Sequence, residues 1–313
     1  MAATVSALGN ATLLITSMRR FSRLKPPELL LMNLALSDMV AVVCMLPLLI
    51  LSAFHHRWLG GERTCAYYGL MAFLHGGTSI ATFTTLAIVR CMMAFNTHRA
   101  KKYLTRKLMF IIITFIWLHS LLWSLLPLVG WGQYGPEPHG LSCTLAWGQL
   151  REGSGGLSFI FSVFAVLLGV PALVIVTCYS CIACRLSWQY RKMLHCRRLS
   201  RKIHMVQRAV WVAVVMSAGF LMAWTPYAAT SFWLVFNPTS PLPPVVSLLP
   251  TLFANSASAY NPIILYFMSS QFRSNARKLA ADVCRGVASP ENSPKFGHEA
   301  FTATMSTENA LSA

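Results

Sequence analysis

The chain has 313 residues, of which 55% are hydrophobic and only 11% are charged. Soluble domains carry about 25% charged residues, so the composition excludes an ordinary soluble protein and favours a membrane protein. The formal net charge of +17 would suit a nucleic-acid-binding surface. The positions of the basic residues along the chain decide between this interpretation and a membrane protein.

Seven apolar segments are long enough to cross about 30 Å of hydrocarbon, which takes roughly 20 residues of helix. We expect these spans near residues 3–18, 29–53, 65–95, 107–129, 157–184, 203–236 and 243–268. They predict an all-α membrane protein whose seven-transmembrane helix bundle occupies residues 1–268. Residues 270–284 are predicted to form a short amphipathic helix on the membrane surface. Residues 285–313 are polar and poor in aromatic residues, which predicts a disordered cytoplasmic tail.

The basic residues lie almost entirely on one side of these spans. Twenty-three of the 26 lysines and arginines fall in the segments 19–25, 90–107, 185–208 and 273–295. The opposite side holds Arg57, Arg63 and Arg151. This is the positive-inside pattern, which predicts a multi-pass protein with its N-terminus outside and its C-terminus in the cytoplasm. The charge therefore indicates membrane lipid as a partner and argues against nucleic acid.

Three of the nine cysteines carry specific expectations. Cys65 opens the third span on the outer side, and Cys143 lies in the outer loop after the fourth span. Both face an oxidising compartment, so we predict a disulfide between them, with two free thiols as the alternative. Cys284 ends the amphipathic segment and is a candidate for palmitoylation, an unmodified thiol being the alternative.

Few polar side chains lie inside the predicted spans, and each is a candidate for function. Asp38 lies mid-span, where an ionisable side chain costs about 2.5–3.5 kcal/mol, so it must face partners or water. Pro262 frees a backbone carbonyl in the seventh span, and Asn10 and Asn261 can satisfy it. These polar side chains have two alternative roles. They either only hold the helices together, or they rearrange when a signal arrives.

Seven short segments, taken in their order along the chain, resemble the rhodopsin-like (class A) G-protein-coupled receptors. The matching segments are Gly9–Asn10, "NLALSD" at 33–38, Arg90, Trp117, Pro171, "AWTPYA" at 223–228 and "NPIILY" at 261–266. Within that class, "GWGQYGPEPHGLSC" at 130–143 and the "AWTPYA" stretch resemble the opsins, nearest the non-visual neuropsin-like and peropsin-like opsins. The resemblance covers essentially the whole chain.

The resemblance implies a ligand pocket in the outer half of the bundle. It places Glu137 in the loop that covers the ligand, and Tyr68 where vertebrate visual opsins have a counterion glutamate. Trp224 corresponds to the aromatic residue that packs against the ligand and swings on activation, and plain core packing is the alternative for it. Tyr227, in the same "AWTPYA" stretch, completes this part of the expected pocket.

In opsins, a lysine six residues before the "NP" asparagine carries retinal as a Schiff base. Here that residue is Asn255, whose amide nitrogen is not nucleophilic because its lone pair is delocalised into the carbonyl. All eight lysines lie on the predicted cytoplasmic side. We therefore predict no covalent cofactor, while a non-covalent retinoid stays open. Asn255 either binds water or a polar ligand group or only fills the space of the lysine.

The resemblance also implies a set of residues for activation and G-protein coupling. They are Arg90, Tyr179, Asn261, Pro262, Asp38 and Asn10. The acid that normally precedes the arginine is replaced by Val89, and Val206 stands where a second acid often lies. The tyrosine of the "NPxxY" pattern is replaced by Leu265, with Tyr266 one residue later. These losses weaken the inactive-state lock and one active-state contact.

The function implied is a plasma-membrane receptor that transduces an extracellular or intramembrane signal to heterotrimeric G proteins. The alternative is an opsin-type photoreceptor or retinoid sensor that binds retinal non-covalently. Arrestin and a receptor kinase are further expected partners, since the tail offers hydroxyl residues for phosphorylation, unless the tail is inert. These are Ser293, Thr302, Thr304, Ser306 and Thr307. We expect no enzyme, no metal site and no transporter, because no nucleophile–base cluster, metal-ligand spacing or inverted repeat is visible.

Overall fold

The computed structural model describes residues 2–137, 140–147, 155–193, 200–237 and 243–288. The five hydroxyl residues of the tail and the side chain of Val206 lie outside the described residues.

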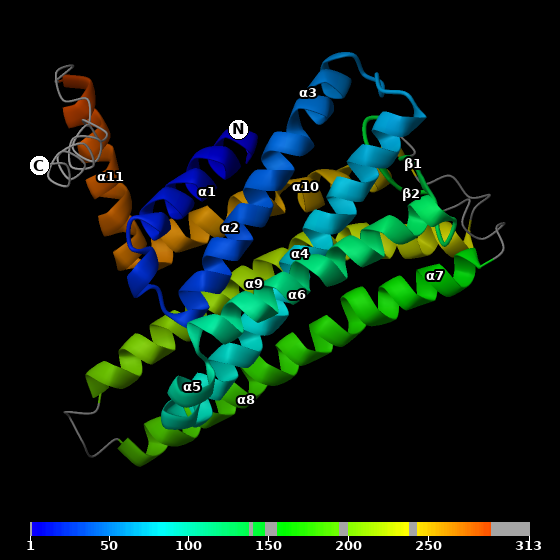
Figure 1. Cartoon of the computed structure of the whole chain (residues 1–313). Coiled ribbons are helices and arrows are strands. Elements are labelled where there is room, and N and C mark those ends of the chain that lie inside the picture. Colours follow the sequence, from blue (N-terminus) through cyan, green and yellow to red (C-terminus); the bar gives the residue numbers. More distant parts are fainter. Residues whose placement is uncertain (1, 138–139, 148–154, 194–199, 238–242, 289–313) are drawn as a thin grey trace, which may run out of the picture.

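Seven spans pack into one bundle (Figure 1). They are α1 (Ala2–Met18), α2 and α3 (Pro26–Cys44, Leu46–Phe54), α4 (Glu62–Phe95), α6 and η2 (Arg106–Leu125, Leu126–Val129), α7, η3 and α8 (Gly156–Ser162, Val163–Gly169, Val170–Met193), α9 (Ser200–Phe236) and α10 (Pro244–Met268). The amphipathic helix α11 (Ser270–Ala288) follows them. The predicted fold class, a seven-helix bundle followed by a short helix, is confirmed.

Five of the helical segments in the described part of the chain are long and apolar enough to cross a membrane by length and hydropathy alone. These are Pro26–Cys44, Glu62–Phe95, Arg106–Val129, Gly156–Trp188 and Val210–Phe236. α1 is apolar but has only 17 residues, and α10 carries two asparagines and three prolines. Both helices complete the bundle by packing, since α10 lies against α9 and α1.

The second span is not the single helix that we expected over residues 29–53. α2 ends at Cys44 and α3 begins at Leu46, with Pro47 in the first turn of α3. Proline has no backbone N–H and its ring clashes with the carbonyl four residues earlier, so it breaks the helical hydrogen-bond ladder. The span bends at this point without leaving the bundle.

The fifth span contains one wider stretch. Between α7 and α8, residues Val163–Gly169 form the π-helical segment η3. A π-helical turn shifts the side chains relative to a regular α-helix, and such turns are frequent at functional sites. Val163, Phe164, Leu167 and Leu168 of this segment line the cavity described below.

A small hairpin covers one end of the bundle (Figure 1). Its strands β1 (Tyr134–Pro136) and β2 (Cys143–Leu145) pair antiparallel, with Pro136 opposite Cys143. The predicted disulfide is confirmed, because Cys143 is bonded to Cys65 of α4. The hairpin was not expected in an all-α chain, and the disulfide ties it to the third span.

The opposite end of the bundle carries two short elements that we did not expect, α5 (Thr97–Tyr103) and η1 (Phe21–Arg23). Asn96 caps α5, because its side chain accepts a hydrogen bond of 2.9 Å from the backbone N–H of Arg99. Arg106 holds η1 by donating to the carbonyls of Phe21 and Ser22 at 2.7 Å.

The helix after the seventh span is longer than predicted. α11 extends to Ala288, whereas residues 270–284 were predicted for this helix. Its strong separation of apolar and basic faces suits a membrane surface. Asp282 of α11 accepts a charged hydrogen bond of 2.7 Å from Arg19 at the end of α1. α11 therefore contacts the first span as well as the seventh. The remainder of the predicted tail, 289–313, lies outside the described residues.

Candidate functional site

A cavity of about 140 Å³ lies under the hairpin, at the end of the bundle that the hairpin covers. Its walls come from α4, η3, α9 and α10, and the hairpin closes one side. All five residues that the sequence placed in a ligand pocket line this cavity: Tyr68, Glu137, Trp224, Tyr227 and Asn255. The structure brings together, at a single site, residues that lie as far as 187 positions apart in the sequence.

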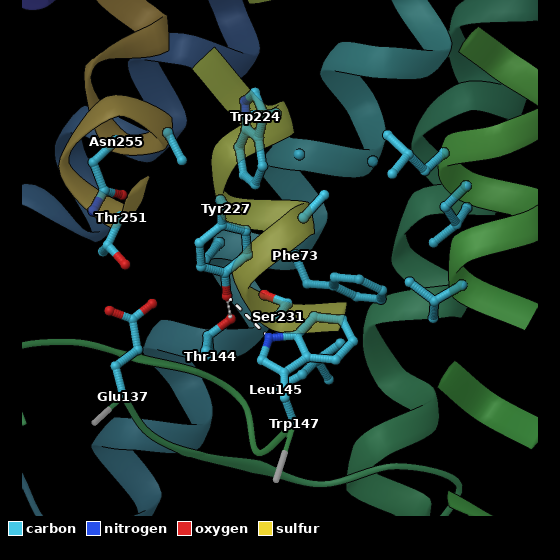
Figure 2. Close-up of a pocket in the computed structure, with 18 of the residues that line it drawn as sticks. Phe73, Glu137, Thr144, Leu145, Trp147, Trp224, Tyr227, Ser231, Thr251 and Asn255 are labelled. Atoms are coloured by element: carbon cyan, nitrogen blue, oxygen red, sulfur yellow. Dashed lines mark hydrogen bonds between the residues drawn. The ribbon is translucent and has the colours of Figure 1, made fainter. Parts of the chain in front are cut away.

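The hairpin is held over the cavity by hydrogen bonds to the sixth span (Figure 2). The hydroxyl of Tyr227 lies 2.6 Å from the hydroxyl of Thr144 and accepts a hydrogen bond of 3.2 Å from the indole N–H of Trp147. Glu137 accepts a hydrogen bond of 2.6 Å from the hydroxyl of Ser142 within the hairpin. These bonds orient the Tyr227 and Glu137 side chains before any ligand binds.

Tyr134 anchors the hairpin to the fourth span. Its hydroxyl donates a hydrogen bond of 2.7 Å to the carbonyl of Ser124. Burial raises the pKa of the Tyr134 hydroxyl well above its ordinary value, because the charged phenolate would lose its hydration. Tyr134 therefore stays a neutral hydrogen-bond donor over the physiological pH range.

One wall of the cavity is apolar and aromatic. Phe220 and Trp224 of α9 lie with ring centroids 5.8 Å apart and planes at 34°. Gly76 of α4 faces the Trp224 ring so closely that an added Cβ would lie 3.3 Å from the ring. Phe73 and the side chains of η3 continue this wall. A flat apolar group would fit this surface.

The opposite wall is polar. Asn255 and Thr251 lie one turn apart on α10 and point into the cavity (Figure 2). Neither makes a side-chain hydrogen bond within the described part of the chain. The hydroxyl of Tyr68 is also buried here and has no hydrogen-bond partner among the described residues. These groups are available to a ligand.

A second cluster of polar side chains lies deeper in the bundle. One carboxylate oxygen of Asp38 lies 3.0 Å from the imidazole Nε2 of His75, and the other accepts a hydrogen bond of 3.0 Å from Asn261. The side chains of Asp38 and His75 are only 2% and 10% exposed. Asp38 thus has partners on α4 and α10, as a buried acid requires.

The asparagines of the cluster join the other helices. Asn10 donates a hydrogen bond of 3.0 Å to the carbonyl of Ser258, the residue four positions before Pro262. This is the carbonyl that the proline leaves without an intrahelical donor. Asn33 accepts a hydrogen bond of 2.8 Å from the indole of Trp117 and donates one of 2.9 Å to Thr82. Five spans therefore meet through buried side-chain hydrogen bonds.

At the end of the bundle opposite the hairpin, Arg90 lies near the C-terminal end of α4. The Nε of Arg90 is buried without a hydrogen-bond partner in the described part of the chain, and Tyr179 lies 3.2 Å from the hydroxyl of Ser217. Leu265 is only 4% exposed, whereas Tyr266 is 45% exposed. The two residues of α10 therefore face different ways, as one step of about 100° on a helix requires.

The family model for "7 transmembrane receptor (rhodopsin family)" matches residues 9–265. The chain belongs to the rhodopsin family of seven-transmembrane receptors. It is therefore a multi-pass membrane protein, and the predicted class A resemblance is confirmed.

Two relatives of this receptor and one solved structure place it among the opsins. Opsin-5 of Mus musculus is 36% identical over 273 residues, which cover 86% of this chain and 71% of that protein. The protein of Mizuhopecten yessoensis named "Rhodopsin, G0-coupled" is 31% identical over 284 residues, or 88% of this chain and 69% of that protein. The crystal structure of squid rhodopsin superposes with a TM-score of 0.80 at 26% identity, covering 90% of this chain and 83% of that one. The relatives are receptors rather than enzymes.

Some residues of the receptor's two polar clusters were not predicted as site residues. Thr251 lies four residues before Asn255, and Ser231 lies four residues after Tyr227. Residues four apart share a face of a helix, so this spacing could have predicted both as cavity residues. His75 is one of three histidines inside the predicted spans, which gave a weaker signal. Thr144 and Trp147 gave none, because their positions depend on the fold of the hairpin.

The remaining predicted site residue, Cys284, is an exposed free cysteine near the end of α11. Its position on an amphipathic helix suits lipidation, which stays a prediction. No group of three or more histidine, cysteine or acidic side chains that could hold a metal ion occurs in the described part of the chain.

Proposed function

We propose that this chain is an opsin-family receptor that passes an extracellular or intramembrane signal to heterotrimeric G proteins without carrying retinal as a covalent Schiff base. The observation that carries the proposal is the position of Asn255. It lies in the cavity wall, where the family resemblance expects the retinal lysine. An amide cannot form a Schiff base, so any ligand of this cavity binds reversibly.

The positions of the lysines support the same proposal. Lys25 precedes α2, Lys102 lies in α5, Lys107 begins α6 and Lys278 lies in α11. These elements lie at the end of the bundle opposite the hairpin that covers the cavity (Figure 1). This distribution also supports an orientation with α5 and α11 in the cytoplasm and the hairpin outside the plasma membrane.

G-protein coupling is supported by the relatives and by the inner face. One relative is named as a G0-coupled rhodopsin. Arg90 lies at the inner end of α4, where Val89 provides no carboxylate beside it. An arginine without this partner is free to enter the active-state arrangement, so we expect basal activity. Arrestin and a receptor kinase are proposed as partners of the tail.

Nucleotide exchange on purified heterotrimers tests the coupling. The receptor in nanodiscs should accelerate GTPγS uptake by at least one heterotrimer of a panel, and Arg90→Leu should abolish the acceleration. Arg57→Leu removes an arginine at the outer end and should leave the uptake unchanged. The coupling proposal is wrong if no heterotrimer exchanges faster than it does with empty nanodiscs.

A second candidate function is a sensor that binds retinal non-covalently. The aromatic wall formed by Phe73, Phe220 and Trp224 favours it, because it suits a flat apolar polyene. The same exchange assay decides between the two. A change in GTPγS uptake on adding retinal, or on illuminating the retinal-loaded receptor, would favour the sensor, and unchanged uptake would favour another ligand.

A further inference from the structure

We propose that the cavity binds an amphipathic amine, with a flat apolar body against Trp224 and a terminal ammonium group between Glu137, Thr251 and Asn255. The inference rests on the proposed function and deepens it, because a receptor without a covalent chromophore needs a ligand that binds reversibly.

Oxygen atoms from three elements gather at the polar end of the cavity. Figure 2 shows the Glu137 carboxylate of the hairpin pointing toward Thr251, with Asn255 one turn further along α10. Tyr68 of α4 adds its buried hydroxyl, which has no hydrogen-bond partner among the described residues. Tyr68, Glu137 and Tyr227 all line the same cavity.

Tyr227 is not the group that holds the ligand's polar end. Its hydroxyl already interacts with Thr144 at 2.6 Å and with Trp147 at 3.2 Å. Thr251 and Asn255 make no side-chain hydrogen bond within the described residues, so they offer the hydroxyl and amide oxygens that a donor requires. The polar group of the ligand therefore lies on the α10 side of the cavity.

The charge of the lining selects the class of polar group. Among the described residues that line the cavity, Glu137 carries the one formal charge, which is negative. A primary ammonium group supplies the opposite charge and three N–H donors. These donors match a carboxylate oxygen, the Thr251 hydroxyl and the Asn255 carbonyl. Hydrogen bonds between charged groups are roughly twice as strong as neutral ones.

Other polar groups fit this end less well. A ligand carboxylate would be repelled by Glu137, and the repulsion is strong in a site of low dielectric. An alcohol has a single O–H donor for three acceptors. An aldehyde has no N–H or O–H donor and would leave Glu137, Thr251 and Asn255 without a donor from the ligand.

The other end of the cavity selects the body of the ligand. Gly76 lets α4 approach the Trp224 ring closely, since an added Cβ would lie only 3.3 Å from it. Phe220 lies against the same ring, with a centroid distance of 5.8 Å. Aromatic walls of this kind favour flat rings or conjugated chains. The ligand is therefore apolar along its length and cationic at one end.

Four probes with the same polyene body separate the charge from the apolar contacts. Retinylamine is cationic, N-acetylretinylamine and retinol are neutral, and retinoic acid is anionic. Binding to the full chain in nanodiscs is followed by quenching of tryptophan fluorescence, with empty nanodiscs as the blank. We expect retinylamine to bind at least tenfold more tightly than its acetylated form, and retinoic acid to bind most weakly.

Paired variants locate the effect in the cavity. Glu137→Gln should bring the ratio of the two amine Kd values to near one, whereas Glu62→Gln should leave it unchanged. Glu62 is an exposed acid at the outer end of α4, away from the cavity lining, so it controls for attraction to the membrane surface. Asn255→Leu should lower the ratio severalfold, and it decides the matter if Glu137→Gln does not fold.

Three results would overturn the inference. They are equal binding of retinylamine and its acetylated form, tighter binding of retinol or retinoic acid, or an equal loss of preference in Glu62→Gln and Glu137→Gln. Covalent attachment of retinal to the wild-type chain would instead overturn the proposed function. The two failures are therefore distinguishable.

Discussion

Asp38 and His75 place two ionisable side chains in contact at the centre of the bundle, 3.0 Å apart and nearly inaccessible to solvent. Removing one partner of a buried pair costs up to about 3–5 kcal/mol, and here Asp38 keeps its hydrogen bond from Asn261. We therefore expect His75→Leu to lower the thermal unfolding midpoint of the receptor in detergent by several degrees.

His119→Leu is the matched control for this change. His119 is another histidine inside the spans, and its ring nitrogen accepts a hydrogen bond of 3.1 Å from the indole of Trp123. That variant should lose about 1 kcal/mol. The double variant Asp38→Asn/His75→Leu should lose less free energy of unfolding than the two single variants lose together. Strictly additive losses would show that the two side chains are not coupled.

The residues of the cavity could be predicted only where a sequence motif marks them. Tyr68, Trp224 and Asn255 follow from the opsin resemblance, which implies their roles from their spacing to Cys65, Pro226 and Asn261. The contact between Asp38 and His75 could not be predicted. It depends on how α2 and α4 are rotated against each other, and the spacing within one helix carries no information about that rotation.

Gly9 sets the distance between the first and seventh spans. A Cβ at this position would lie 2.4 Å from Cβ of Pro262, so α1 and α10 would have to separate. Overpacking of this kind costs about 1–3 kcal/mol, and helix separation would also disturb the bond from Asn10 to Ser258. Gly9→Ala should therefore lower the unfolding midpoint, measured in detergent.

Gly219→Ala separates packing from helix propensity. Gly219 lies inside α9, and a Cβ there would meet Ile264 at 3.6 Å, an ordinary contact distance. Both substitutions gain about 1 kcal/mol of helix propensity, so Gly219→Ala should leave stability unchanged or raise it. An equal response of the two variants would contradict the close packing of α1 on α10.

The attachment of α11 to α1 depends on pH. A hydrogen bond from Arg19 is the main cause of a lowered pKa of Asp282, with the nearby Arg285 adding to the effect. Because the pKa is lowered in the folded state, the contact is complete above the ordinary pKa of aspartate, about 3.9, and is lost as the pH falls through the lower folded value.

A nitroxide on Cys284, with the other free cysteines replaced by serine, reports this contact. Its mobility in the electron paramagnetic resonance spectrum should stay low at neutral pH and rise below about pH 4. Asp282→Asn should be mobile at every pH. A pH response that survives in Asp282→Asn would show that another group holds α11.

Element boundaries were predictable where hydropathy defines them and not where hydrogen bonding does. A bilayer forces each spanning segment into a helix, so apolar length predicts where spans lie. The break at Met45 and the π-helical segment η3 change the hydrogen-bond ladder without changing hydropathy. The hairpin and α5 are too short for periodicity, and the Cys65–Cys143 bond and the Asn96 cap position them.

At the scale of the whole molecule, charge and hydropathy were enough to predict the bundle, and the ordered motifs were enough to predict the family. The ligand could not be predicted in the same way. Its identity depends on groups from the hairpin, α4 and α10 that meet only in the folded chain. In the proposed function, the residue at position 255 decides between a covalent pigment and a receptor with a reversible ligand.

Covalent attachment of retinal is the measurement that tests this claim most directly. The wild-type receptor is incubated with 11-cis and all-trans retinal, denatured in acid, and analysed by mass spectrometry for a retinal adduct on α10. We predict no adduct in the wild type and an adduct at residue 255 in Asn255→Lys, because the lysine amine can attack the aldehyde in a pocket that is otherwise retained. Retinal that stays attached to the denatured wild-type chain would contradict the account.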